Sequence, residues 1–339
     1  MVSTSPNAAG ASSPAPAMKP SSAQLTTTKT TVEFRAALIA MAFIAAIPLF
    51  VSNAYWLGVL IVSMYFAILA GGWNLLAGYT GQFSLAPAAF AMIGAYTTGL
   101  LATYFAVPPL LGIPAAIVVA GVIGLALGRA VMRLNGPYLA LTTLSFAEIM
   151  RLVISNSIDI TRGDLGLSVP GMINNRIVWY YFFLGVLVAL LVGFYLLLRS
   201  KAGLFLQAIR DDEVAARRAG VDVVFWKTAA FALSAASAGF AGALYAHFAE
   251  LVTPELGLIG QTGLIVSMTV IGGIGTLAGP IIAAFIVYVI SEWLRDVGGY
   301  QLIVFAALVV IFARFFREGL WGLAKSGYKK FSAKRGTST

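Results

Sequence analysis

Long apolar stretches alternate with short polar segments along most of this chain. A helix rises 1.5 Å per residue, so about twenty residues cross the roughly 30 Å hydrocarbon layer of a membrane. At that length the pattern predicts about ten spans. They are expected at residues 36–51, 55–76, 87–106, 109–131, 137–156, 177–198, 227–249, 260–275, 277–294 and 301–316. The pattern therefore indicates an all-α polytopic membrane protein.

Two glycine-rich segments interrupt this pattern. Gly78, Gly81 and Pro87 lie in the first, and residues 273–280 form the second. Glycine and proline break the helical hydrogen-bond ladder, and such backbone is tolerated at membrane depth where protein buries it or where it lines a cavity. We therefore expect broken or re-entrant helices at both places. The stripe of small residues Ser234, Ala238 and Gly242 predicts close helix packing.

Composition and charge predict how the spans are oriented in the membrane. The chain is 60% hydrophobic and has a formal net charge of +9. With ten spans, its basic clusters all fall on one side, and basic residues mark the cytoplasmic side of a membrane. Both termini and a coupling segment, 199–224, are therefore expected in the cytoplasm, with loop 157–176 and a shorter loop at 250–258 outside. No basic patch is interleaved with base-stacking aromatics, so nucleic acid is not an expected partner.

The same reasoning divides the chain into three parts. Residues 1–34 read as a disordered cytoplasmic tail, because residues 1–31 are rich in Ser, Thr, Ala and Pro and contain no acidic residue. Residues 35–320 form the predicted transmembrane domain. Residues 321–339 form a basic cytoplasmic tail. The first apolar run is long enough to span a membrane, so we expect it to be retained rather than cleaved as a signal peptide.

Catalytic chemistry is not expected. There is no cysteine and one histidine, so the sequence predicts no disulfide, no thiolate metal site and no other protein metal site. It contains no phosphate-binding loop, serine–histidine pair or paired catalytic carboxylates. The Gly273-Ile-Gly275 pattern follows no strand and lies among apolar spans, so it does not indicate a dinucleotide site. We expect no enzymatic activity and no cofactor bound by this chain.

Residues 207–220 carry six charged side chains in fourteen positions. Helical spacing predicts one short helix there, with Leu206, Ile209, Val214 and Ala216 as its apolar members. Acids early and arginines late suit the helix dipole, and Gly220 is placed to end the helix. Two interpretations stay open: a solvated connection between two spans, or a docking helix for a soluble subunit.

Polar residues inside the spans are candidates for a translocation path. They are Asn74, Gly78, Gly81, Gln82, Ser84, Thr142, Thr143, Glu148 and Arg151. The alternative for the first seven is structural packing, since threonine and serine hydroxyls also bond their own helix. Glu148 and Arg151 lie one turn apart, so they are either a neutralised structural pair or a gating or partner contact.

Five segments, in order, resemble the branched-chain amino acid ABC permease family, most closely its larger permease subunit (LivM type). They are AGYTGQFSLAPAAFAMIGAYTTGLL (77–101), NGPYLALTTLSFAEIMRLV (135–153), TRGDLGLSVPG (161–171), AIRDDEVAARRAGVDV (208–223) and VIGGIGTLAGP (270–280). The resemblance covers residues 36–325. It implies an ABC importer permease architecture in a bacterial cytoplasmic (inner) membrane.

The resemblance also implies partners. They are a second homologous permease, two cytoplasmic ATPases that use ATP and Mg, and an external periplasmic or lipid-anchored substrate-binding protein. The ATPase-coupling residues would be Arg210, Asp211, Asp212, Glu213, Ala215, Ala216 and Gly220. Loop 157–176, with Asp159, Arg162 and Asp164, is a candidate platform for the binding protein, and the alternative is an ordinary solvated loop.

The substrate would be a branched-chain or related apolar amino acid, while urea, short amides and aromatic acids stay open. The rival from another class is an ion-coupled secondary transporter in which Glu148 binds the coupling ion.

Overall fold

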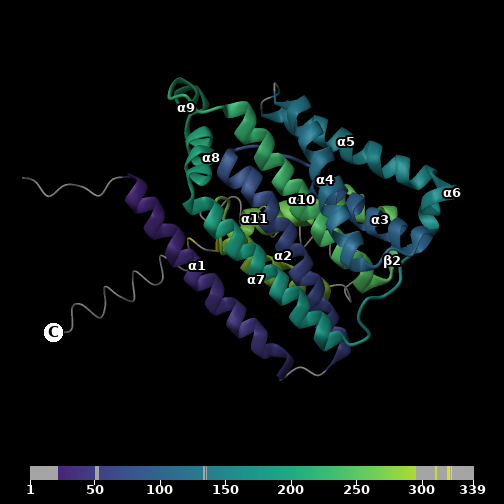
Figure 1. Cartoon of the computed structure of the whole chain (residues 1–339). Coiled ribbons are helices and arrows are strands. Elements are labelled where there is room, and N and C mark those ends of the chain that lie inside the picture. The colour runs from purple at the N-terminus through teal and green to yellow at the C-terminus, as the bar shows by residue number, and fades with distance from the viewer. Residues whose placement is uncertain are drawn as a thin grey trace, which may run out of the picture.

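The computed structural model describes residues 22–49, 53–132, 134, 136–294, 310, 319–320 and 322. Long helices dominate this part of the chain (Figure 1). The elements are α1 (Ser22–Ala46), the 3-10 helix η1 (Ile47–Leu49), α2 (Ala54–Thr80), α3 (Pro87–Phe105), α4 (Pro109–Val131), α5 (Pro137–Asn156), α6 (Ile158–Thr161), η2 (Gly163–Leu165), β1 (Leu167–Ser168), α7 (Arg176–Arg199), α8 (Lys201–Asp211), α9 (Glu213–Arg218), α10 (Val223–Ala249), β2 (Leu251–Val252), η3 (Pro254–Gly257), α11 (Ile259–Gly272) and α12 (Gly279–Trp293).

The prediction of a helical, multi-pass membrane protein is confirmed. Within the described ranges, 7 helices are long and apolar enough to cross a membrane, namely α1 from Thr31 onward, α2, α3, α4, α5, α7 and α10. The expected eighth and ninth spans correspond to α11 and α12, which are shorter, with 14 and 15 residues. The tenth expected span, 301–316, lies outside the described residues except for Val310. The count of ten and the sides of the termini stay predictions.

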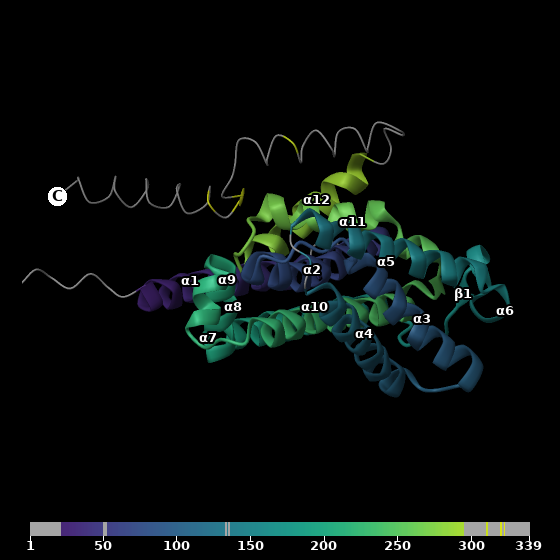
Figure 2. The ribbon, with the colours of Figure 1, turned by 90° about the horizontal axis from the view of Figure 1, so that it is seen from above.

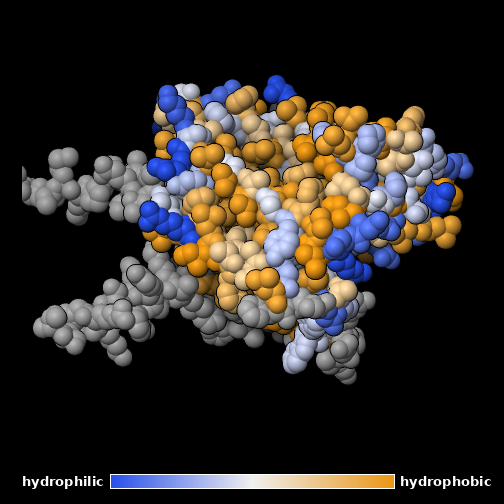
Figure 3. All heavy atoms as spheres, turned by 60° about the horizontal axis from the view of Figure 1, so that its bottom comes forward, coloured by the Kyte–Doolittle hydropathy of each residue, from blue (hydrophilic) through white to orange (hydrophobic). Residues whose placement is uncertain are grey.

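The helices run between two polar ends. Helices α8 and α9 lie at one end, and α6 with the β1–β2 ribbon lies at the other (Figures 1 and 2). On the face shown in Figure 3, orange hydrophobic spheres cover most of the middle, and blue hydrophilic spheres gather toward the two ends. An apolar belt between polar ends is the surface that a membrane requires. The two ends are called here the α9 end and the ribbon end.

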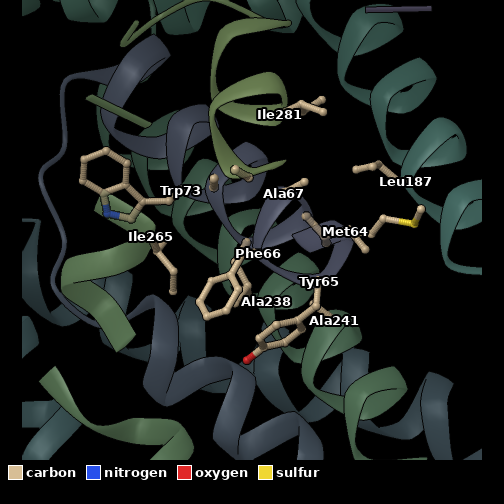
Figure 4. Close-up of a cluster of buried hydrophobic side chains, with 14 of the residues drawn as sticks. Met64, Tyr65, Phe66, Ala67, Trp73, Leu187, Ala238, Ala241, Ile265 and Ile281 are labelled. Carbon is tan, nitrogen blue, oxygen red and sulfur yellow. The ribbon is translucent and has the colours of Figure 1, made fainter. Parts of the chain in front are cut away.

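Helix α2 occupies the centre of the bundle. It packs against α7, α10, α11 and α12. Figure 4 shows its side chains pointing to several sides, toward Leu187 of α7, Ala238 and Ala241 of α10, Ile265 of α11 and Ile281 of α12. Met64 and Ala67 are fully buried, and Trp73 is only 1% exposed. A helix that is apolar all round is stable only when neighbours cover every face, and α2 meets that condition.

Small residues bring α10 close to α3 and α4. A Cβ added at Gly242 would lie 1.8 Å from the backbone oxygen of Ala91, and one added at Gly239 would lie 2.3 Å from the Ala120 Cβ. Ser234 and Ala238, on the same helix, are also buried. The predicted small-residue stripe is therefore confirmed as a packing surface. Close backbone approach is the main source of helix association where lipid provides no hydrophobic drive.

At the ribbon end, two connections are tied together. Leu167 pairs with Val252 and Ser168 with Leu251 in an antiparallel ladder. The buried His247 places Nδ1 3.0 Å from the Pro170 oxygen and Nε2 2.9 Å from the Thr98 hydroxyl. A carbonyl oxygen only accepts, so Nδ1 is the donor in the first bond. His247, the single histidine, therefore connects α10 by hydrogen bonds to α3 and to the loop that contains Pro170.

Gly242→Ala tests the close packing of α3 and α10. We expect the free energy of unfolding to fall by about 1–3 kcal/mol, the usual cost of overpacking a tight contact. The thermal midpoint of the purified protein in detergent measures the change.

Gly185→Ala on α7 is the matched control, because a Cβ there meets no other atom within 4 Å. We expect its midpoint to stay at or above the wild-type value. Equal losses in both variants would refute the role assigned to Gly242.

Candidate functional site

The first predicted break is present between α2 and α3. Helix α2 ends at Thr80, and Gly81 follows in a left-handed conformation with φ 72°. The backbone beyond it is satisfied by side chains: Trp73 Nε1 donates to the Ser84 oxygen at 2.7 Å, and Leu85 N–H donates to Thr143 Oγ1 at 2.9 Å. Non-helical backbone at this depth therefore has protein partners, as an apolar surrounding requires.

The second break lies between α11 and α12, and Asn74 joins it to the first. Asn74 Nδ2 donates to the Thr276 oxygen, and Gly275 N–H donates to Asn74 Oδ1, each at 2.8 Å. A Cβ on Gly78 would lie 2.6 Å from the Gly275 nitrogen, so only glycine allows this approach. Segments about two hundred residues apart thus form one unit, which sequence spacing did not reveal.

The charged segment differs from the single helix that we expected. It forms two helices, α8 and α9, separated by Asp212 with φ −157° and ψ 106°. The Asp212 carboxylate accepts hydrogen bonds from Val214 N–H and Ala215 N–H, both at 2.9 Å. The prediction of one helix is wrong because this aspartate competes for backbone donors and begins a new helix as its N-cap.

The predicted end of the segment is confirmed. Gly220 has φ 84°, a left-handed conformation that favours glycine. Its N–H donates to the Arg217 oxygen at 3.1 Å, and Val221 N–H donates to the Ala216 oxygen at 3.1 Å. These two bonds form a Schellman motif, which satisfies the last carbonyls of α9.

Helix α9 is attached to the bundle by ion pairs and a small apolar cluster. Glu213 bonds Lys227 at 2.5 Å and Arg217 at 3.1 Å. Ala216 is 5% exposed and packs in a small cluster with Ile209 and Val223. Two coupling candidates therefore face their own chain.

Val214, in contrast, is 59% exposed, so it does not share the buried face of the other predicted apolar members Leu206, Ile209 and Ala216. It begins the first turn of α9, immediately after the cap at Asp212. It is the large apolar side chain that α9 presents to solvent.

Arg210 links these helices to the breaks. Its Nη1 donates to the Gly78 oxygen at 2.9 Å, and its guanidinium also pairs with Asp211 at 3.0 Å. A Cβ added at Gly275 would lie 3.1 Å from Arg210 Nη1, so the guanidinium bonds the first break and lies beside the second. We call Asn74, Gly78, Arg210, Gly275 and Thr276 the coupling junction.

Two further charged residues support this region, and sequence reasoning missed both. Glu33 of α1 is 5% exposed, and its carboxylate accepts the Leu277 N–H at 2.9 Å. The Lys227 side chain is 12% exposed and anchors Glu213. A carboxylate at the start of the first apolar run was a usable signal for Glu33, since a charge near the membrane is costly without a partner.

Gln82 differs from its neighbours in its hydrogen bonding. It is 3% exposed, and neither its Oε1 nor its Nε2 has a hydrogen-bond partner among the residues that the structure describes. It lines a cavity of about 40 Å³ together with Lys227 and residues of α4 and α5. A buried amide without partners is a costly arrangement, so Gln82 is the path candidate for which packing offers the weakest explanation.

The candidates on α5 divide into two groups. Thr143 is buried and bonded into the first break, whereas Thr142 Oγ1 donates to the Tyr138 oxygen of its own helix at 2.8 Å. Arg151 binds both carboxylate oxygens of Glu148, with the shortest contact at 2.5 Å. The pairing of Glu148 with Arg151 is therefore present. The structure brings Asn74, Gly78, Ser84 and Thr143 to the breaks but leaves this pair apart, toward the ribbon end.

The long apolar helices, their breaks and the charged helices at one end define a multi-pass membrane transport protein. The chain belongs to the family described as branched-chain amino acid transport system / permease component, whose model matches residues 55–313.

Named relatives agree with this membership. The chain is 30% identical over 329 residues to the "High-affinity branched-chain amino acid transport system permease protein LivM" of Salmonella typhimurium, covering 88% of this chain and 77% of that protein. The LivM of Escherichia coli K12 gives the same identity and coverage. A "Probable branched-chain amino acid transport permease protein LivH" of Methanocaldococcus jannaschii is 27% identical, covering 74% of this chain and 85% of that protein. No solved structure matches the chain significantly.

Gln82→Met tests whether the unpartnered amide serves transport. We expect the free energy of unfolding to stay equal or rise by about 1 kcal/mol, because an apolar side chain of similar length removes an unsatisfied buried group. We expect substrate uptake to fall in the same variant. Thermal unfolding and uptake are measured together.

Thr228→Val is the matched control, since the Thr228 hydroxyl is also buried with no partner in the described part of the chain but lies on α10. Its uptake should equal that of the wild type. Unchanged uptake in Gln82→Met would return Gln82 to a packing role.

Proposed function

We propose that this chain is the membrane-spanning permease subunit of an ATP-driven importer of branched-chain or related apolar amino acids. The observation that carries the proposal is the coupling junction, in which Arg210 bonds the backbone of Gly78 and Asn74 bonds the backbone of Gly275. The relatives named as branched-chain amino acid permeases favour this substrate class over urea, short amides and aromatic acids.

The proposed mechanism is mechanical. Cytoplasmic ATPase subunits dock on the exposed surface of α9 and use ATP and Mg, while this chain itself performs no chemistry. The Glu213 to Lys227 pair and the packing of Ala216 keep α9 rigid against α10. A push on α9 therefore passes through α8 to Arg210 and into the two breaks. The spans then change which side of the membrane they open to.

Two other partners, a second permease and a substrate-binding protein, are assigned to different surfaces of this chain. A second homologous permease completes the translocation path, in a bacterial cytoplasmic membrane with the α9 end inside. The ribbon end receives an external substrate-binding protein. There the β1–β2 ladder joins loop 157–176 to the loop after α10, and Asp164 accepts a hydrogen bond from Ser155. Two loops held in one frame present a firmer platform than either alone.

The ion-coupled alternative has less support. It requires Glu148 to exchange a proton or a cation with the solution. The Glu148 carboxylate instead receives three hydrogen bonds from Arg151, which already neutralises its charge.

Uptake into vesicles tests the proposed function. The chain is reconstituted with a second permease, ATPases and a binding protein, and radiolabelled L-leucine uptake is followed. We expect uptake to require ATP and the binding protein and to persist when ion gradients are collapsed. Uptake driven by a gradient without ATP would replace the proposal with the ion-coupled alternative.

Val214→Arg tests docking at α9. Val214 is exposed, so the substitution leaves the packing of α9 intact while it places bulk and positive charge on the docking surface. We expect ATP-dependent uptake and ATPase co-purification to be lost, with an unchanged thermal midpoint. Pull-down with the tagged chain and vesicle uptake measure these effects.

Val224→Arg at the start of α10 is the matched control, because Val224 is also exposed, at 41%. This control should keep both ATPase binding and uptake. Full activity of Val214→Arg would contradict docking at α9.

A further inference from the structure

A cavity among the described residues lies at the ribbon end, away from the coupling junction. It has a volume of about 520 Å³ and opens between the outer ends of α2, α7, α10 and α12. Its lining includes Tyr55, Arg176, Trp179, Phe248, Glu250 and Glu292. We call it the outer cleft. Its volume falls within the range of about 300–1,000 Å³ that is typical of small-molecule sites.

An aromatic wall forms one side of the outer cleft. The Trp179 ring centroid lies 5.8 Å from that of Phe248, which in turn lies 6.4 Å from Tyr245. The row continues to Tyr65, 4.7 Å from Tyr245, in a second cavity of about 240 Å³. Both cavities share Val62, Tyr288 and Glu292, so the aromatic surface leads from the opening toward the central helix α2.

The positively charged side chain of Arg176 lies on one side of the cleft. The Arg176 Nη1 donates to the Ala54 oxygen at 2.9 Å and would lie 3.1 Å from a Cβ at Gly58, so α2 holds the guanidinium in place. That bond occupies one of five donors. Within the described part of the chain, no carboxylate pairs with Arg176. A fixed guanidinium with free donors suits a carboxylate ligand.

The carboxylate of Glu250 lies at the C-terminal end of α10. Glu250 has φ 59°, a left-handed conformation that is uncommon outside glycine, and it caps a helix C-terminus, where a negative charge is disfavoured. It forms no ion pair with any described cation. The second acid in the cleft, Glu292, accepts a hydrogen bond from Tyr55 at 2.6 Å. Glu250 is exposed and lines the cleft, so its carboxylate is available to a ligand there.

From this geometry we infer that the outer cleft binds an apolar amino acid in its zwitterionic form. Arg176 holds the carboxylate, Glu250 holds the ammonium group, and the wall of Trp179 and Phe248 receives the side chain. Charges of both signs beside an aromatic surface match such a ligand, whereas a hydrocarbon chain or a neutral amide leaves both charges unused. This site rests on the proposed function and gives this chain its own contribution to substrate selection.

Direct binding to the full chain tests the inference. The chain is reconstituted alone in lipid nanodiscs, and three probes are titrated by calorimetry: L-leucine, L-leucinamide, which lacks the carboxylate, and 4-methylpentanoate, which lacks the ammonium group. We expect each analogue to bind at least about tenfold more weakly than L-leucine, because each loses one charge-assisted contact.

Two variants assign the contacts. Arg176→Gln should weaken L-leucine binding about tenfold and leave L-leucinamide binding unchanged, since that probe has no carboxylate to lose. Glu250→Gln should weaken L-leucine in the same way and leave 4-methylpentanoate unchanged. Arg129→Gln, at the last turn of α4 and outside the cleft, is the matched control and should bind like the wild type.

Three results would overturn the inference: no saturable L-leucine binding, equal affinities for the three probes, or unchanged L-leucine affinity in both cleft variants. The vesicle assay separates this failure from failure of the proposed function. ATP-driven leucine uptake by the complete complex, without binding to the isolated chain, removes the cleft and leaves the function standing. A complete complex that imports no amino acid removes the function instead, whatever the cleft binds.

Discussion

A constraint on backbone hydrogen bonding explains much of this structure. Peptide groups in a hydrocarbon layer need partners inside the protein, so a helix that breaks there must find other donors and acceptors. Here each break supplies partners to the other, with Asn74 bonding the backbone of Thr276 and Gly275. Trp73 and Thr143 satisfy the rest of the first break. The breaks are therefore stable only when α2, α5 and α11–α12 are assembled together.

The same constraint gives the coupling junction its mechanical character. The Gly78 oxygen, released from its helix near the end of α2, accepts a hydrogen bond from Arg210 on α8. Helix α9 follows α8 after one extended residue and is fastened to α10 by Glu213 and Lys227. Rigid helices joined to irregular backbone by a short charged contact suit a transmission element. The irregular backbone is where a small displacement changes dihedral angles at least cost.

The two ends of the molecule carry different chemistry. The α9 end is charged and tightly bonded within the chain, which suits contact with a protein partner. The ribbon end holds the outer cleft, where Arg176 and Glu250 keep unused bonding capacity beside an aromatic wall. Helix α2 connects the two, since its first residues line the cleft and its last residues form the junction.

The sequence by itself determined the helical, multi-pass class, the bounds of α4 and α5, both breaks, the small-residue stripe and the end of α9 at Gly220. These features depend on local chemistry: apolar length, proline at helix starts, and glycine where the chain turns. The tertiary structure alone decided that Asn74 meets Gly275, that Arg210 reaches Gly78, and that Ala216 faces inward while Val214 faces solvent. Sequence pattern could not supply these contacts, because hydrogen bonds between residues far apart along the chain exist only after the helices have packed.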